Sequence, residues 1–550
     1  MRSRTVLSLL LPLAACEGSL VSGSPDAGAA PDSSPFMDAS VAEDSAASDD
    51  AAPGRDAAGA PDRGAPDAAP PDGSTPDVGR PGGGAGVVDL RVVADEGATS
   101  RASGGVPFPM GELFETGALE VRDAGGRSVA FSATVLASWP QDGSVRSVLV
   151  AFDPGLGRGE EEAFELRYGD VAGPAPESAT PVLDGPGVLL VDPVWIADSR
   201  AFGPLQPRAD NDRFERFDAR VEDELVSMSP AFTSYDVSCR GTSAHRTYYD
   251  SPHGIWMLSM RASSPELHRR ARAESAWYRA NELTWYEGRS LAVQVCEASG
   301  WTPSRAINWS VLRRMTSQGM LDDYLMTGDP AAREAVAAMG EAFVQNLPAL
   351  RGGRENVLRV TERNLAWTLM GVAAYYAIEP SERVRAALDS LVTEAFDWQN
   401  DGSSGAFEHD IVRPDPSECS DGPAGGSPFM TSLLVDGLMD AFALTNDARI
   451  PGVVTRTAAW LRDDAVTPNG RAFRYLWGCN SNGYEGTSAD LNNLIVHVFG
   501  AAYEVSGDIA WLEAGDRFAD AGMAAIYVGR PKQWSQTVRG FARYLGYRAR

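Results

Sequence analysis

Hydrophobic and polar residues alternate in short segments between residues 87 and 170, which is the pattern of β-strands with one buried face. The alternation is clear at 87–93 and 130–136, and a continuous apolar run follows at 147–152. Turns rich in glycine and aspartate separate these segments. We therefore predict an all-β barrel or sandwich domain over residues 87–245.

From about residue 253 the hydrophobic period lengthens to between three and four residues, as in amphipathic helices. The period is clear in three segments, 336–347, 430–442 and 491–502. An aromatic residue five positions before an aspartate recurs at 324–329, 442–447 and 503–508. A Gly or Asn precedes each aspartate, and these residues tolerate the left-handed conformation that ends a helix. The recurrence predicts helical hairpins of about 50–65 residues. We expect an α/α toroid (a six-hairpin, glycosidase-like fold) over residues 246–550, with an open helical array as the alternative.

The first 16 residues have the pattern of an export signal. Arg2 and Arg4 precede an apolar run at 6–13, and small residues lead to Cys16. The Leu-Ala-Ala-Cys stretch at 13–16 resembles the box of bacterial lipoproteins, in which the cysteine is lipidated. Residue 17 is glutamate, which favours the outer membrane or cell surface of a Gram-negative bacterium. An ordinary secretory signal is the alternative.

Residues 17–86 consist mainly of Ala, Asp, Pro, Gly and Ser. Large apolar side chains are almost absent, so this segment buries too little surface to offset the entropy of ordering. We predict a disordered linker that holds the folded part away from a membrane.

The charge and length exclude two classes of protein. The chain has 550 residues with 48 basic and 75 acidic side chains, a net charge of −27, which argues against nucleic acid as a partner. The only long apolar run lies in the signal and is too short to span a bilayer.

Four cysteines remain after Cys16 is set aside, and an even number in an exported chain indicates two disulfides. We favour Cys239–Cys296 and Cys419–Cys479, because each pair joins neighbouring loops of the expected fold.

One segment has the spacing of a calcium-binding loop. Asp397, Gln399, Asp401 and Glu408 occupy positions 1, 3, 5 and 12, with glycine at position 6. Gln399 and Ser404 depart from that pattern, so a chance match is the alternative. No cofactor is otherwise required.

Two stretches of the β-rich part, 105–113 and 138–146, resemble the N-terminal RIFT barrel of exo-rhamnogalacturonan-lyase-like (YetA-like) proteins. The stretches 319–329 and 363–367 resemble the α/α toroid of the same family. The resemblance implies a lyase that acts on an extracellular, uronate-containing polysaccharide. Residues 314–318 replace a His-x-Trp pattern of the family, which keeps open a non-catalytic, surface-anchored glycan-binding protein.

In a toroid, the loops that precede the inner helices surround a central funnel, and this placement selects the candidate site. Elimination beside a carboxylate needs a base, a cation for the developing negative charge and an acid for the leaving oxygen. Of the five histidines, His253 and His409 are our candidate bases. Tyr249 or Tyr484 would be the partner, and Arg363 would bind the carboxylate. The alternative is that these two histidines, two tyrosines and the arginine are ordinary polar residues of loops.

Hydrolysis is the competing chemistry, and it needs two carboxylates on either side of the glycosidic bond. Acidic residues in the same loops are Asp250, Glu408, Asp410 and Glu485. We also expect Asp250, Glu408 and Glu485 to contact substrate, together with the loop tryptophans Trp477 and Trp534.

Overall fold

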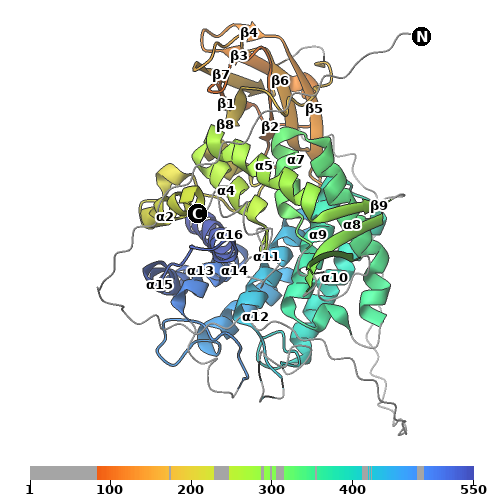
Figure 1. Ribbon diagram of the computed structural model, residues 1–550, viewed down its shortest axis with the longest axis vertical. Helices are drawn as coiled ribbons and strands as arrows, with labels where there is room; N and C mark the ends of the chain where they lie inside the picture. The colour runs from red at the N-terminus through yellow and green to blue at the C-terminus, as the bar shows by residue number, and fades with distance from the viewer. Residues whose placement is uncertain are drawn as a thin grey trace, which may run out of the picture. The chain divides into compact units, whose positions relative to one another are not determined.

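The computed structural model describes most of residues 83–550. Its gaps are 172–174, 228–246, 287–289, 298–299, 305–311, 313–314, 353–355, 412–418, 420–421, 423 and 480–487. The expected signal, Cys16 and residues 17–82 of the expected linker therefore lie outside the described residues. The last linker residue, Gly86, instead begins strand β1 (Gly86–Val93). Strands dominate the first part of the described chain and helices the rest (Figure 1). Among the described residues, no helix is long and apolar enough to cross a membrane.

The N-terminal strands form two antiparallel sheets, which confirms the β-rich character expected from the alternation. The first sheet has the order β4-β3-β7-β1-β8, and its strands are Ser128–Val129, Leu119–Asp123, Glu161–Tyr168, Gly86–Val93 and Val188–Val191. The second has the order β2-β6-β5, with strands Ala102–Pro107, Val145–Phe152 and Phe131–Ser138. Strand β2 contacts β8, so the two sheets meet there and share a core that contains Val88, Val106 and Val148.

The β-rich part ends earlier than the boundary at residue 245 predicted from the sequence. Its last strand ends at Val191, and helices α1 (Pro193–Ser199) and α2 (Glu215–Ser227) follow. Helix α2 packs on α16 (Pro531–Arg548), where the Trp534 Nε1–H donates to the Val221 carbonyl at 2.8 Å. Residues before 246 thus take part in the helical region.

Inner helices of the helical region form a closed ring. They are α4 (Ser251–Ala262), α7 (Gln318–Thr327), α9 (Glu362–Ile378), α11 (Pro428–Thr445), the pair α13 (Asn492–Ile495) and α14 (His497–Ser506), and α16. Each contacts the next, and α16 contacts α4, which closes the ring. Outer helices pack around it: α5 (Pro265–Asn281), α8 (Pro330–Gly352), α10 (Glu382–Asp401), α12 (Ile450–Asp463) and α15 (Ala510–Ala524). This is the arrangement of an α/α toroid, not of an open array. A sheet that the sequence did not predict, β9 (Leu283–Tyr286), β10 (Ser290–Glu297) and β11 (Gly300–Ser304), lies between α5 and α7 along the chain.

The repeated aromatic-to-aspartate motif ends inner helices, as its sequence predicted. Gly328, Asn446 and Gly507 cap α7, α11 and α14 with φ angles of 73°, 52° and 71°. The N–H of each capping residue donates to the carbonyl of the aromatic residue of the motif: Tyr324, Phe442 and Tyr503. An outer helix then starts within four residues of each cap.

The β-rich part packs against the C-terminal end of α7. The Ser147 hydroxyl donates to the Leu325 carbonyl at 2.8 Å, and the Tyr324 hydroxyl donates to the Leu136 carbonyl at 2.9 Å. Gly105 allows this approach, because a Cβ atom there would lie 1.8 Å from the Leu325 carbonyl oxygen. Side chains of β5 and β6 therefore reach the C-terminal end of the inner ring.

Candidate functional site

A cavity of about 370 Å³ lies where the β-rich part meets the inner ring. Its polar lining comes from segments far apart in the chain. Trp139 and Arg146 come from the β5–β6 hairpin, His253 from α4, Gln318 and Asp322 from α7, Asp440 from α11, and Arg543 and Tyr547 from α16. The ring thus collects acids, bases and cations that share no sequence motif.

His253 and Asp322 form the central pair of the cavity. Asp250 caps α4 by accepting the His253 N–H at 3.3 Å, which places the imidazole at the start of the helix. The His253 Nδ1 lies 2.6 Å from the Asp322 Oδ2, and its Nε2 lies 3.4 Å from the Arg543 Nη2. A guanidinium only donates, so Nε2 accepts and Nδ1–H donates to Asp322.

The surroundings of this pair set its protonation. Burial raises the pKa of Asp322 to about 8, although Arg543 and Arg146 act in the opposite direction. Burial lowers the pKa of His253 to about 3, and the nearby Arg539 and Arg543 guanidinium groups add to that effect. At neutral pH the imidazole is therefore neutral and Asp322 holds its proton. Because Oδ2 accepts from His253, that proton resides on Oδ1.

Asp436 forms ion pairs with two arginines near this pair, Arg539 and Arg543. The Arg539 Nη2 lies 2.9 Å from the Asp436 Oδ2, and the Arg543 Nε lies 2.8 Å from its Oδ1. All three side chains are buried. Burial alone would raise the pKa of Asp436, but Arg543 and Arg539 outweigh it and hold that pKa at about 2. Asp436 is thus a permanent anion that orients Arg543 beside the cavity.

Asp440 is another acidic residue that lines the cavity. The Gln318 Nε2–H donates to its Oδ2 at 2.5 Å, and the Arg543 Nη2 lies 3.5 Å from its Oδ1. Burial raises the pKa of Asp440, while Arg543 lowers it. Asp440 is therefore a carboxylate with raised basicity beside a fixed cation.

Arg146 is a buried cation without an ionic partner among the described residues. Its Nε–H donates to the Ala201 carbonyl at 3.1 Å, its Nη2 donates to the same oxygen, and its guanidinium lies 5.0 Å from the Trp139 ring centre. Its Nη1 has no hydrogen-bond partner in the described part of the chain. Burial lowers the pKa of Arg146 to about 10, so it stays charged at neutral pH.

Most of the described loop residues proposed from the sequence lie at the other end of the ring, near the start of α9. The Arg363 Nη1–H donates to the Tyr248 hydroxyl at 2.8 Å, and Tyr249 lies beside the same guanidinium. Tyr249 is buried with a φ of 69°, and burial raises its pKa. The structure thus brings Tyr249 and Arg363 together.

His409 lies at the same end of the ring. Its Nδ1 is 3.4 Å from the Glu362 Oε2, and Glu362 accepts the Ser427 N–H at 2.7 Å. His253 lines the cavity instead, and no contact among the described residues joins the two histidines. The two proposed bases thus belong to separate clusters.

The remaining loop candidates have varied surroundings. Asp250 is a buried helix cap, and Glu408 accepts from the Ser404 hydroxyl at 2.8 Å. Trp477 is half-buried, with its ring centre 6.0 Å from that of Trp460. Trp534 was predicted to contact a ligand, but its side chain is fully buried in the core and has no ring face available. Tyr484 and Glu485 lie outside the described residues.

The calcium loop that the spacing predicted does not form. Asp397 and Gln399 lie on α10, which extends to Asp401, so the first five positions are helical. The Gln399 amide donates to the Thr457 hydroxyl at 2.9 Å, and Asp401 pairs with Arg359 at 2.6 Å. Within the described ranges, no cluster of three or more His, Cys, Asp or Glu side chains is arranged to hold a metal ion.

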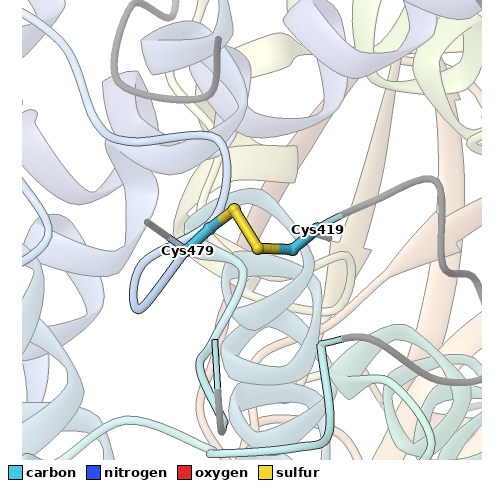
Figure 2. The surroundings of a disulfide bond; sticks show 2 residues. All are labelled: Cys419 and Cys479. Carbon is cyan, nitrogen blue, oxygen red and sulfur yellow. A yellow bond between two sulfur atoms is a disulfide. The ribbon is translucent and has the colours of Figure 1, made fainter. Parts of the chain in front are cut away.

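A disulfide joins Cys419 and Cys479, with the Cα atoms 5.8 Å apart (Figure 2). This confirms one predicted pairing, and Cys239 of the other pair lies outside the described residues. The disulfide connects the loop before α11 to the loop before α13. The same loops pair through the backbone of Gly426 and Trp477, next to the bridge between Gly425 and His409. The disulfide therefore constrains the two loops that lie next to His409 and Glu362.

Removal of this disulfide is expected to lower the free energy of unfolding by about 2–4 kcal/mol, because it closes a loop with a sequence separation of 60 residues. The Cys419→Ser/Cys479→Ser double variant should show this loss in urea denaturation relative to the oxidised wild type. Equal unfolding midpoints for the double variant and the oxidised wild type would contradict the expectation.

No known protein family and no curated protein matches the chain. Among solved structures, the chain is similar to a polysaccharide lyase, with 13% identity and a TM-score of 0.43 over 60% of this chain and 98% of that chain. It is also similar to a sugar epimerase from a ruminal bacterium, with 14% identity and a TM-score of 0.39 over 55% and 85% of the two chains. A third similar structure is the unsaturated glucuronyl hydrolase from Bacillus sp. GL1, with 16% identity and a TM-score of 0.33 over 46% of this chain.

The chain spans 64% of the length of that hydrolase. These three similar structures are carbohydrate-active enzymes by name. Likenesses this low carry no argument about the present chain.

Sequence reasoning missed the cavity residues Asp322, Asp440, Arg146 and Arg543. Two of them lie in stretches that had attracted attention in the sequence, since Arg146 ends the stretch 138–146 and Asp322 lies within 319–329. The acids offered a second signal, since Asp322 and Asp440 occur in mainly apolar helices that each carry one further aspartate, Asp323 and Asp436.

Proposed function

We propose that this chain is a carbohydrate-active enzyme that binds a uronate unit of an extracellular polysaccharide in the cavity and cleaves the glycosidic bond by elimination. One observation carries the proposal: the buried cation of Arg146, which has no ion-pair partner among the described residues, lines the same cavity as the carboxyl group of Asp322. Burial raises the pKa of that carboxyl group, which favours its acid form. The cavity volume of about 370 Å³ suits a small ligand or one end of a chain.

The three requirements of elimination have candidates in the lining. Arg146 would bind the uronate carboxylate and stabilise the charge that develops on it when the neighbouring C–H proton leaves. Asp440, whose pKa is raised by burial, would remove that proton. Asp322 would donate its Oδ1 proton to the leaving glycosidic oxygen. The electron pair of the C–H bond becomes the new C=C bond as the C–O bond breaks.

His253 has a positioning role in this proposal. With a pKa of about 3 it is a poor base, and its two ring nitrogens are engaged by Asp322 and Arg543. Its Nδ1–H fixes the Asp322 Oδ2 and leaves the protonated oxygen for the substrate.

Hydrolysis is the second candidate, because Asp322 and Asp440 are two carboxyl groups lining one cavity. An acid and a base in that relation are also what a glycoside hydrolase needs. The products distinguish the reactions, since elimination leaves an unsaturated uronate that absorbs ultraviolet light and hydrolysis does not.

The test is to incubate the full chain with a panel of polysaccharides that contain galacturonate, glucuronate or mannuronate. Rising ultraviolet absorbance together with new reducing ends is the expected result. New reducing ends without absorbance would replace elimination by hydrolysis. Binding without any product would favour a glycan-binding protein, and the absence of both binding and product across the panel would refute the proposed function.

We also propose that the chain is exported and anchored to the outer membrane or cell surface through a lipid on Cys16. The residues at 13–16 support this, and the linker at 17–86 would separate the anchor from the enzyme. Cells expressing the chain and fed labelled palmitate should yield a labelled protein in the membrane fraction. The Cys16→Ser variant should be unlabelled and recovered in the soluble fraction; equal labelling of the two would contradict the proposal.

A further inference from the structure

The hydrogen bonds of Arg146 leave one buried edge of its guanidinium without a partner among the described residues. A guanidinium has five N–H groups in a plane, and Nε and Nη2 use one edge to bind the Ala201 carbonyl. The opposite edge consists of Nη1 and the second N–H of Nη2. Nη1 has no partner among the described residues. Two parallel N–H groups are the geometry that binds the two oxygens of one carboxylate.

The surroundings of that unpaired edge favour the binding of an anion. Arg146 is 8% exposed, so water does little to stabilise its charge. The other cations of the cavity already have carboxylates, since Arg543 pairs with Asp436 and Arg200 pairs with Glu504 at 2.7 Å. Arg146 alone among the described lining cations that are buried lacks an anion within ion-pair distance.

A free carboxylate and its methyl ester differ most at such a position. The carboxylate offers two oxygens that share a negative charge, and it neutralises the buried cation. The ester offers one neutral carbonyl oxygen and a methyl group, and it adds no negative charge to the longer-range effect of Asp440 and Asp322 on the cation. Replacing the carboxylate by the ester therefore costs more binding affinity here than beside a surface charge, where water substitutes for the missing anion.

Resting on the proposed function, we infer that Arg146 is the specificity-determining residue that makes this cavity select free uronates over their methyl esters. A partly esterified polysaccharide would then be a substrate only at its de-esterified positions. The class of reaction that must precede this one on such a polymer is ester hydrolysis, which releases methanol and exposes the carboxylate.

The test measures binding of the full chain to each polyuronate of the panel, both as the free acid and after complete methyl esterification. For at least one polymer, the free acid is expected to bind about 10- to 100-fold more tightly than the ester, the range for a hydrogen bond to a charged group. In R146Q the affinity for the acid should fall to that for the ester, whose own affinity stays unchanged. R146K keeps the charge but loses the paired N–H groups, and we expect an intermediate ratio.

R167Q is the matched control, because Arg167 is a half-exposed arginine on β7 that pairs with Glu165. It should keep the full acid-to-ester ratio. R146Q removes the buried charge but also the hydrogen bonds to the Ala201 carbonyl, so its folding is checked by urea denaturation. If R146Q fails to fold, R146K decides the test by its acid-to-ester affinity ratio.

The two possible failures are distinct. If acid and ester bind alike, or if both Arg146 variants keep the wild-type ratio, the inference falls while the proposed function stands. If neither form of any polymer binds or is cleaved, the proposed function falls and the inference falls with it.

Discussion

Replacement of Asp322 by asparagine is expected to lower kcat by about 10²- to 10⁴-fold, the usual contribution of a positioned general acid. Asparagine keeps the size of the side chain and accepts the His253 N–H, but it has no acidic proton for the leaving oxygen. KM should change only a few-fold, because Arg146 and the rest of the cavity remain. Steady-state kinetics on a cleaved polyuronate would measure both parameters.

The pH dependence gives an independent readout of the same residue. Burial raises the pKa of Asp322 to about 8, so the acid form is lost as the pH rises through that value. Wild-type activity should fall on this alkaline side, and the residual activity of Asp322→Asn should not. Asp389→Asn serves as the control, because Asp389 is an exposed partner of Arg449 on the outer helix α10. An alkaline fall that persists unchanged in Asp322→Asn would exclude Asp322 as the acid.

Replacement of Asp436 by alanine is expected to lower the free energy of unfolding by about 3–5 kcal/mol, because it leaves Arg539 and Arg543 buried without their shared anion. The pKa of Asp436 is about 2 in the folded protein, below its ordinary value of 3.8. Its contribution to stability is therefore present above pH 3.8 and is lost as the pH falls through about 2. Denaturation by urea at neutral pH would measure the loss.

The surface pair of Arg462 and Asp463 provides the control for this experiment. Both side chains are more than one-third exposed, at 37% and 55%, and Asp463→Ala should change stability by no more than about 1 kcal/mol. Asp436→Asn keeps the shape of the side chain and should show a smaller loss than alanine, which keeps the test informative if Asp436→Ala does not fold. Equal losses for Asp436→Ala and Asp463→Ala would show that the buried network is not stabilising.

The helical part of the fold was predictable because its signals are local. The apolar periods at 336–347, 430–442 and 491–502 correspond to stretches of α8, α11 and α13–α14. Gly328 and Asn446 end helices because few other residues tolerate positive φ. The sheet β9–β11 was missed, since a periodic signal for short strands between helices is weak. The end of the β-rich part was also missed, because α2 is fixed by its packing on α16.

The candidate site was much less predictable, for a physical reason. Arg146, Asp322 and Asp440 are neighbours only because the ring closes and the β5–β6 hairpin reaches it. They are far apart in the sequence, so the sequence pattern did not indicate that they share a cavity. Taken singly, each is an ordinary charged residue. Loop placement instead selected Tyr249, Arg363 and His409, and the structure groups them near the start of α9. Among the proposed catalytic residues that the structure describes, only His253 lines the cavity.

Closure of the ring also has a consequence for biogenesis. Helix α16 contacts α4 although the two helices are far apart in the sequence. His253 on α4 and Arg543 on α16, for example, are 290 residues apart. The first inner helix to leave the ribosome must therefore remain without its final neighbour until the last one has been synthesised. Loop closures of this length slow folding, and the half-built ring exposes apolar helix faces in the meantime. A chain of this topology should depend on holding chaperones during synthesis and transit, and premature termination before α16 should mark it for proteolysis.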